Sequence, residues 1–208
     1  MRYDISFPRF RRILKQMIDE GFEIGLHASY NTWQGWERIA AERERLEQVA
    51  GQLVTGNRHH YWHMRHPFWH TLEAHERAGL RYDSSLAFND AQGFRLGIAF
   101  PFHPWNPITA RPVKTLQIPV MIMDGAYFVA QGLSIDESLE QFARLLDGLK
   151  RFEGVAAIDW HEYTSYPGSV WFKNLGEAYQ AILKLLSADP EVGVQCCRDV
   201  LDRYGLPD

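Results

Sequence analysis

The stretch Phe22-Glu23-Ile24-Gly25-Leu26-His27 is the segment from which the fold prediction starts, because it reads as a short strand that ends at a histidine. Before it, residues 8–20 place apolar side chains at helical spacing, with Pro8 at the opening and Gly21 at the close. After it, residues 36–50 are rich in strong helix formers and have one apolar face. The segment is therefore a strand between two amphipathic helices.

The same alternation continues to the end of the chain. Further strands are predicted at 53–57, 80–83, 116–123, 155–159 and 192–194, and further helices at 68–78, 134–149, 174–187 and in the residues before Gly205. Ser134 and Glu137 predict a capping box at the start of one of these helices. Alternation of this kind implies parallel strands. About six strands fit either an open doubly wound sheet or a barrel with a missing piece, and periodicity leaves both open.

Composition limits the class of protein. A length of 208 residues predicts one domain spanning 1–208, and no segment approaches the ~20 apolar residues of a membrane span. Nucleic acid is not an expected partner, because the net charge is −4 and basic residues do not cluster beyond Arg9, Arg11 and Arg12. The only cysteines, Cys196 and Cys197, are adjacent, so a reducing, cytoplasmic location fits best. The oligomeric state is not predicted.

Polar residues follow the predicted strands, where βα architectures form their active sites. Histidine and aspartate, which bind divalent metals and transfer protons, account for most of them. The polar residues that follow the predicted strands are His27, Arg58-His59-His60, Asp83-Ser84-Ser85, Asp124 and His161. Two of them have a structural alternative, since His161 could be a packed imidazole bonded to a carbonyl and Asp83 could cap a turn.

Some other histidines are assigned to a structural role, and two tryptophans have either a structural or a substrate-binding role. His66, His70 and His75 have helical spacing, which favours a solvated helix face over a metal site. Trp62 and Trp105 lie in predicted loops, where they would either pack into the core or stack on a sugar ring.

The segment Gly25-Leu26-His27-Ala28-Ser29-Tyr30 resembles the second motif of the polysaccharide deacetylase superfamily, in the form found in a bacterial branch. The resemblance covers nearly the entire chain in order. Its further matches are Arg58-His59-His60-Tyr61-Trp62-His63, Arg81-Tyr82-Asp83-Ser84-Ser85-Leu86, Gly93-Phe94-Arg95, the segment from Ile118 to Gly125, and Trp160-His161. It implies a distorted (β/α) barrel of the polysaccharide deacetylase type.

The resemblance also implies a reaction, the metal-dependent hydrolysis of acyl groups, chiefly N-acetyl, on a carbohydrate substrate. A bound divalent metal, with zinc expected and iron, cobalt or nickel as alternatives, would activate water. Carried over by motif, His27 is the first metal histidine, His161 the general acid and Arg58 the residue that orients the base.

One motif position departs from the family pattern. The second metal histidine is expected four residues after His27, where this chain has Asn31. We nominate His60 as the replacement ligand, with His59 and His63 as rivals. The remaining site predictions are less direct: Asp159 positions His161, and the residues expected to line the substrate site are Asp83, Asp124, Tyr61 and Trp62.

The family's Asp-rich first motif precedes a stretch like Tyr3-Asp4-Ile5, and the sequence begins after it. We therefore expect a barrel without its first strand and a chain without the catalytic base. Two hypotheses follow: a hydrolase that needs an upstream segment, or a non-catalytic carbohydrate-binding or scaffold protein that has lost the metal centre. A nucleotide-binding function is excluded because no glycine-rich phosphate loop is present.

Overall fold

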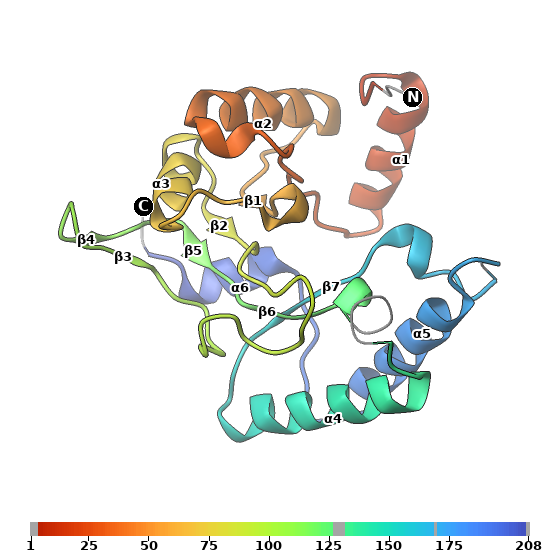
Figure 1. The fold of residues 1–208 in the computed structure, drawn as a ribbon. Coiled ribbons are helices and arrows are strands. Elements are labelled where there is room, and N and C mark those ends of the chain that lie inside the picture. The colour runs from red at the N-terminus through yellow and green to blue at the C-terminus, as the bar shows by residue number, and fades with distance from the viewer. Residues whose placement is uncertain (1–3, 127–131, 169, 207–208) are drawn as a thin grey trace. The chain divides into compact units, whose positions relative to one another are not determined.

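A computed structural model describes residues 4–126, 132–168 and 170–206 (Figure 1). The helices are α1 (Pro8–Asp19), α2 (Trp36–Ala50), α3 (Trp69–Arg77), α4 (Ile135–Arg151), α5 (Lys173–Ala188) and α6 (Cys197–Tyr204), with short 3-10 turns η1 (Thr32–Gln34), η2 (His60–Trp62) and η4 (Glu162–Thr164). The strands are β1 (Gly56–Asn57), β2 (Tyr82–Asp83), β3 (Trp105–Asn106), β4 (Arg111–Pro112), β5 (Leu116–Gln117), β6 (Val120–Met123) and β7 (Ala157–Asp159).

The chain divides into two compact units, which are described separately. Unit 1 comprises residues 1–85, 102–117 and 196–208, and unit 2 comprises residues 86–101 and 118–195. The prediction of one domain over 1–208 stays a prediction.

Unit 1 is built on a parallel sheet in the order β1-β2-β5, with α2 packed on α3 (Figure 1). Its apolar core contains Leu26, Ala28, Ile39, Val54, Ala78 and Leu80. Gly56 is required in β1 because a Cβ there would lie 1.8 Å from the ring of Tyr82. The Tyr82 hydroxyl donates to Glu23 Oε1 at 2.6 Å, which ties the segment before His27 to the sheet.

Unit 2 contains the parallel pair β6-β7 and the helices α4 and α5, which lie side by side in Figure 1. Its core consists of Met121, Ile122, Phe142, Leu146, Ile182 and Leu186. The capping box predicted for α4 is confirmed: Ser134 Oγ accepts from the Glu137 backbone N–H, and the Glu137 carboxylate accepts from the Ser134 backbone N–H at 2.9 Å.

The predicted helices and the parallel pairing are confirmed, but the strands are shorter than expected. Residues 22–26 contribute only an isolated bridge between Leu26 and Asn57, and the predicted strand at 116–123 is divided into β5 and β6. The prediction of a strand at 192–194 is wrong, because these described residues have no strand partner. The predicted long loop contains an antiparallel hairpin, β3-β4, which sequence reasoning missed.

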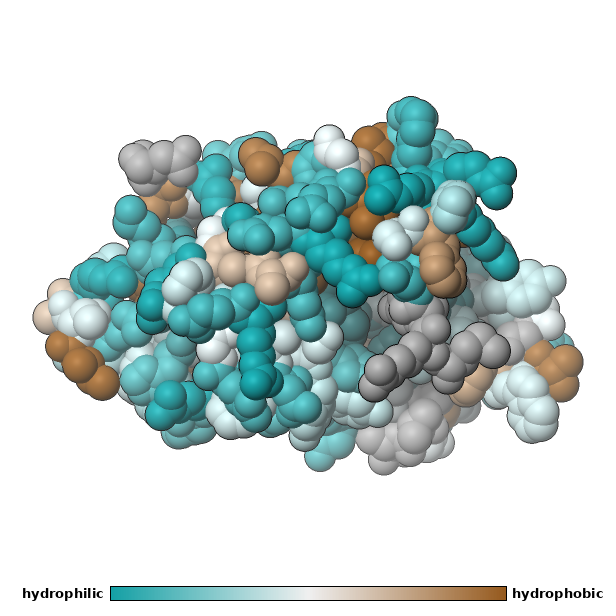
Figure 2. Space-filling model, turned by 90° about the horizontal axis from the view of Figure 1, so that it is seen from above, coloured by the Kyte–Doolittle hydropathy of each residue, from teal (hydrophilic) through white to brown (hydrophobic). Residues whose placement is uncertain are grey.

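The surface over α2 is mainly hydrophilic, as Figure 2 shows from the side on which α2 lies in Figure 1. Within the described residues, every helix is too short or too polar to traverse a lipid bilayer.

Candidate functional site

Two histidine side chains meet on the surface of unit 1. His27 Nε2 lies 3.0 Å from His60 Nδ1, and both residues are exposed. The backbone explains the contact, because the N–H groups of Arg58 and His60 donate to the carbonyl oxygens of Leu26 and Ala28, each at 2.9 Å. Parallel pairing thus aligns the two segments and brings the imidazoles together.

The loop that carries His60 has an uncommon backbone conformation. Tyr61 and Trp62 have φ values of 55° and 48°, in the left-handed region that bulky residues seldom adopt. Trp62 is buried and anchors the turn, whereas the Tyr61 side chain is 71% exposed. A strained turn with an exposed aromatic ring beside His60 is a feature that functional sites often show.

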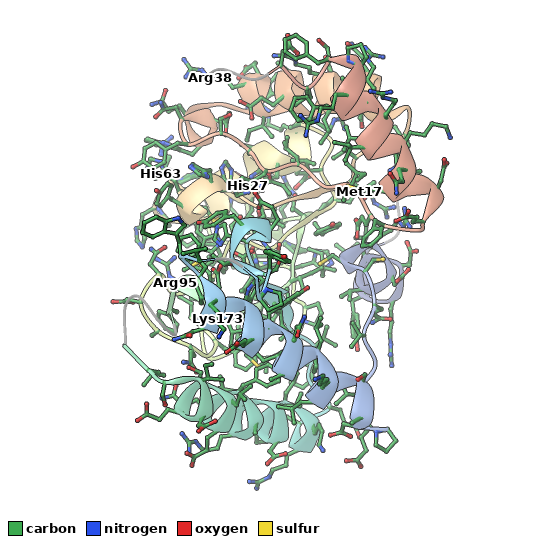
Figure 3. The ribbon with its side chains drawn as sticks, turned by 90° about the vertical axis from the view of Figure 1, so that its right-hand side faces the viewer. Met17, His27, Arg38, His63, Arg95 and Lys173 are labelled. Atoms are coloured by element: carbon green, nitrogen blue, oxygen red, sulfur yellow. The ribbon has the colours of Figure 1, made fainter. Side chains whose placement is uncertain are left out.

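Aromatic rings surround the histidine pair. The Tyr61 ring lies edge-on to both His60 and Tyr30, at centroid distances of 4.6 and 6.1 Å. His63 stacks on Tyr30 at 4.0 Å, and its Nδ1 lies 2.8 Å from the Tyr30 carbonyl oxygen. His27 and His63 are labelled in Figure 3. His63 is therefore held by Tyr30, and His60 is the histidine that contacts His27.

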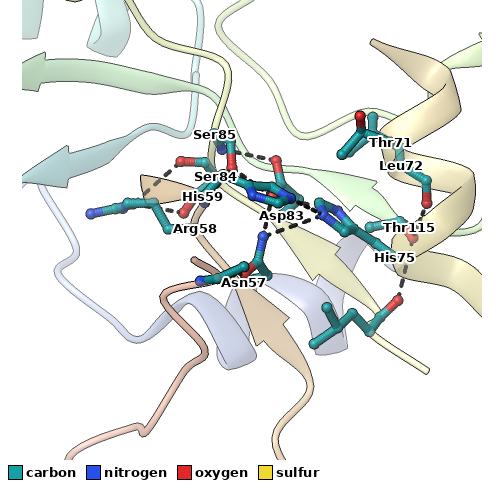
Figure 4. Close-up of polar contacts among 12 residues, drawn as sticks. Asn57, Arg58, His59, Thr71, Leu72, His75, Asp83, Ser84, Ser85 and Thr115 are labelled. Carbon is teal, nitrogen blue, oxygen red and sulfur yellow. Dashed lines mark hydrogen bonds and ion pairs between the residues drawn. The ribbon is translucent and has the colours of Figure 1, made fainter. Parts of the chain in front are cut away.

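Behind this surface lies a buried polar network, drawn in Figure 4. His59 Nε2 and His75 Nε2 are 2.8 Å apart, and His75 Nδ1 lies 3.6 Å from Asp83 Oδ1. Asp83 accepts from the Asn57 side chain at 3.0 Å and from the Ser85 hydroxyl and backbone N–H at 2.7 and 2.8 Å. The Ser85 hydroxyl in turn accepts from the His59 backbone N–H at 2.9 Å, which fixes the start of the His60 loop.

Burial controls the ionisation of this network. It lowers the pKa of His59 and of His75 to about 3, and in His59 the neighbouring His75 adds to the effect. Burial also raises the pKa of Asp83, although donors from Ser85 and Asn57 oppose the rise. Both imidazoles are thus neutral near pH 7, and a neutral imidazole pair can share one proton in the contact between their Nε2 atoms.

Arg58 lies at the edge of this network. Its Nε donates to the hydroxyl and the carbonyl oxygen of Ser84 at 3.0 and 3.3 Å. The contact joins the ends of β1 and β2. The predicted role of Arg58 in orienting a catalytic base stays a prediction.

In unit 2, the residues after β6 and β7 form a second cluster of hydrogen-bonded polar side chains. His161 Nδ1 lies 2.8 Å from Asp124 Oδ1. Asp124 is 2% exposed and also accepts from the Thr164 hydroxyl and from the backbone N–H groups of Gly125 and His161, at 2.8 and 3.3 Å for the latter two. The side chain of His161 is 40% exposed. A buried carboxylate thus fixes the imidazole through Nδ1, and Nε2 is the nitrogen that remains for proton transfer.

The structure shows the surroundings of several predicted site residues, whose roles stay predictions. Asp83 and Asp124, expected to line the substrate site, are each buried and accept several hydrogen bonds. Asp124 contacts His161 Nδ1, and the predicted role of Asp159 in positioning His161 stays untested. Trp62, also expected at the substrate site, is buried.

The three histidines predicted as rivals for the second metal ligand differ in their surroundings. His59 is fully buried, His63 contacts Tyr30 and His60 contacts His27, and a metal-binding role for any of them stays a prediction. Asn31 is exposed and precedes η1.

Sequence reasoning missed two members of these clusters. His75 was expected on a solvated face, yet it is fully buried, because it shares the inner face of α3 with Thr71 and Leu72. Its spacing of three residues from Leu72 was the available signal. Thr164 was not considered. The available signal was its position three residues after His161, from which its hydroxyl can donate to the His161 carbonyl oxygen in a turn. This hydrogen bond is 2.8 Å long in the structure.

The fit of a metal ion can be judged from the donor set. A tetrahedral cation that binds imidazole nitrogens at 2.0–2.1 Å holds two of its ligands about 3.3–3.4 Å apart. His27 Nε2 and His60 Nδ1 are 3.0 Å apart, which is close to that value and is also the length of a direct hydrogen bond. Within residues 4–126, 132–168 and 170–206, no group of three His, Cys, Asp or Glu side chains is arranged to hold a metal. The pair offers two nitrogen donors, and a metal bound by them stays a prediction.

Comparisons with known proteins support the fold. No family model and no curated protein matches the sequence. Among solved structures, the chain is similar to a probable polysaccharide deacetylase from Pseudomonas aeruginosa PAO1, with a TM-score of 0.63, 16% identity and coverage of 94% of this chain and 63% of that one. It is similar to Puue allantoinase, with a TM-score of 0.64, 15% identity and coverage of 94% and 63%.

A third similar structure is a protein assigned as a polysaccharide deacetylase from Mycobacterium smegmatis, with a TM-score of 0.67, 18% identity and coverage of 96% and 68%. These likenesses confirm the predicted fold type. The chain spans 63% of the length of each of the first two structures. The described strands form only small sheets, so the closed but distorted barrel, and its lack of a first strand, stay predictions.

Proposed function

We propose that the chain is a hydrolase that removes acyl groups, chiefly N-acetyl, from a carbohydrate, with His161 as general acid and with His27 and His60 as ligands of a divalent metal. The observation that carries the proposal is the contact between His161 Nδ1 and the buried Asp124 carboxylate. A carboxylate on Nδ1 fixes the tautomer and orientation of an imidazole, as a proton donor to a leaving nitrogen requires.

The residues of unit 2 support this role in detail. Asp124 accepts hydrogen bonds from four donors, two of which are backbone N–H groups. These bonds fix the orientation of its carboxylate toward His161. The side chain of His161 reaches solvent on the other side of the ring. An imidazole that is held on one edge and accessible on the other can give a proton to a bound substrate and recover it from water.

The residues of unit 1 supply the second part of the proposal. When bound, a divalent cation acts as a Lewis acid and lowers the pKa of a coordinated water molecule. His27 and His60 would hold it through Nε2 and Nδ1, respectively. Zinc is the first choice for two imidazole ligands, and iron, cobalt and nickel share the preference for nitrogen donors.

Metal binding is tested by calorimetric titration of the full chain with Zn²⁺ and Co²⁺. We expect His60→Ala to abolish binding. The matched control is His63→Ala, which removes an imidazole from the same loop that is bound to Tyr30 and should leave binding intact. Equal binding by both variants and the parent would refute His60 as a ligand.

Catalysis is tested by acetate release from acetylated chitooligosaccharides, with allantoin as the comparison substrate because one similar structure is an allantoinase. Because the hydrolase hypothesis needs an upstream segment that supplies the base, the assay uses the chain extended by that segment. Acetate release should then depend on His161 and fall by about 10²–10⁴ in His161→Ala, the usual contribution of a general acid. Oligosaccharide binding without hydrolysis or metal uptake would instead favour a non-catalytic carbohydrate-binding protein. Turnover of allantoin alone would move the substrate from carbohydrate to a cyclic ureide.

A further inference from the structure

The segment that follows His161 exposes a group of aromatic side chains. We call Tyr163, Tyr166, Trp171 and Phe172 the aromatic segment of unit 2; their exposed fractions are 55%, 65%, 87% and 36%. Leaving a large apolar ring in water forfeits about 25 cal/mol for each Å² that could have been buried. Groups of exposed apolar residues of this kind usually mark a binding surface.

The backbone under these rings is anchored at three points. Thr164 is buried and its hydroxyl donates to Asp124. A Cβ on Gly176 of α5 would lie 2.5 Å from the backbone nitrogen of Pro167, so the chain packs directly on the helix. The Tyr166 ring covers Gly168, where a Cβ would lie 2.4 Å from the ring. The Tyr166 side chain is therefore exposed although the backbone that carries it is packed against α5. Lys173, labelled in Figure 3, begins α5 directly after the segment.

Two rings of the aromatic segment, Tyr163 and Phe172, connect it to the candidate catalytic histidine. The His161 ring lies 5.4 Å from the Tyr163 ring, which in turn meets Phe172 edge-on at 5.5 Å. Both contacts are within unit 2 and join rings of described residues. A ligand that lies on these rings is therefore adjacent to the imidazole assigned to proton transfer.

The chemistry of the segment selects a neutral ligand. Residues 162–172 contain one charged residue, Glu162, and no Lys or Arg, and the adjacent Lys173 is paired with Glu177 at 3.5 Å. A cluster of cations that would suit a phosphate, a nucleic acid or an anionic lipid surface is therefore missing from this stretch. The exposed rings of Tyr163 and Tyr166 also carry hydroxyl groups. Aromatic faces beside hydroxyl groups suit a ligand that has both C–H faces and hydroxyl groups, which describes a sugar ring.

We propose that the aromatic segment is a subsite for a neutral sugar ring of the substrate chain, next to the sugar whose acyl group is removed at His161. This inference rests on the proposed function and extends it, because it makes the preferred substrate an oligosaccharide and assigns the residues that recognise its length. Trp171 and Tyr166, the two most exposed rings of the segment, would stack on the sugar. Gly168 has no Cβ and so leaves room for the Tyr166 ring.

Binding is measured by calorimetric titration of the full chain with chitotetraose in its fully N-acetylated form, which is a neutral oligomer. Trp171→Ala and Tyr166→Ala should each weaken binding by about five- to tenfold, the value of one lost aromatic contact. Trp171→Phe keeps a ring and should retain most of the affinity. The matched control is Phe152→Ala, which removes another exposed aromatic side chain of unit 2, 67% exposed at the end of α4, and should leave the affinity unchanged.

Hydrolysis provides an independent readout. In Trp171→Ala we expect a higher KM for acetylated chitotetraose and an unchanged rate for 4-nitrophenyl acetate, which is too small to reach a second subsite. Parental affinity and KM in both Trp171→Ala and Tyr166→Ala would overturn the inference while leaving the proposed hydrolase intact. Conversely, chitotetraose binding that depends on Trp171 without acetate release would sustain the subsite and refute the hydrolase.

One other occupant is open to the same experiments. If the rings contact a second copy of the chain, sedimentation velocity should show a dimer that Trp171→Ala dissociates, and chitotetraose should not bind. That result would overturn the sugar subsite.

Discussion

Moderate acid should destabilise unit 1 through the buried pair His59 and His75. The perturbation is a change from about pH 5.5 to about pH 4.5, where both imidazoles are protonated in the unfolded chain and neutral in the native protein. Burial lowers the pKa of each to about 3 from an ordinary 6.5. Because the unfolded chain binds more protons in this range, the free energy of unfolding falls as the pH falls.

The size of the effect follows from a proton count. One extra proton on the unfolded chain changes the free energy of unfolding by about 1.4 kcal/mol per pH unit. Two histidines give a loss of about 3 kcal/mol over this interval, without a discount for exposure because both side chains are fully buried. Asp83 acts in the opposite direction, since its raised pKa lets the native state bind a proton that the unfolded state lacks. One carboxyl group cancels at most one proton, so a net loss of about 1–3 kcal/mol remains.

The assay is urea unfolding followed by tryptophan fluorescence at several pH values. His75→Gln removes one buried imidazole, and its stability should depend less steeply on pH than that of the parent, by about 1.4 kcal/mol per pH unit between pH 5.5 and 4.5. The matched control is Thr71→Ala, on the same buried face of α3, which should lower stability at every pH and keep the parental slope. Identical slopes in His75→Gln and the parent would refute the reasoning.

Three further changes test other contacts. Thr164→Val removes a donor to Asp124, so acetate release should slow by about tenfold with little change in KM, and nitrogen NMR should show a larger fraction of the Nε2–H tautomer of His161. Recovery of both readouts in Thr164→Ser is required if the hydroxyl is the cause. Ser134→Ala removes the α4 capping box and should lower the urea-measured free energy of unfolding by about 1 kcal/mol, whereas no loss would mean that the cap is not formed in solution. Tyr61→Gly should raise the free energy of unfolding by about 1 kcal/mol, because the φ of 55° suits glycine, and Tyr61→Ala should show no such gain.

Helices could be predicted closely because their signals are local. Pro8 opens α1 as expected, and the Ser134–Glu137 pair predicted the start of α4 correctly. Strand ends depend on partners far away in sequence. The break between β5 and β6 contains Pro119, which has no N–H for a sheet ladder, and the hairpin of β3 and β4 lies in a segment whose many prolines favoured a loop.

The candidate site could be predicted only in part for a similar reason. Position directly after a strand was the signal for His27, His60 and His161, and the structure shows that each of these residues contacts another of the predicted site residues. Their partners come from other elements: His75 from the inner face of α3, and Thr164 from a turn after β7. Which of Asp124 and Asp159 contacts His161 depends on the direction of each side chain at the end of its strand, a property that one sequence without relatives does not fix.

The two unfavourable features of unit 1 support each other as evidence for a site at His60. Burying the polar network of His59, His75 and Asp83 costs free energy, and so does the left-handed turn at Tyr61 and Trp62. Both features fix the same four-residue loop, one through the Ser85 hydroxyl on the His59 backbone and the other through the buried Trp62 ring. A loop with no task would gain stability by losing either one, because apolar residues and glycine were available substitutes. The two features together hold the His60 imidazole 3.0 Å from His27, next to the position that the proposed metal ion would occupy.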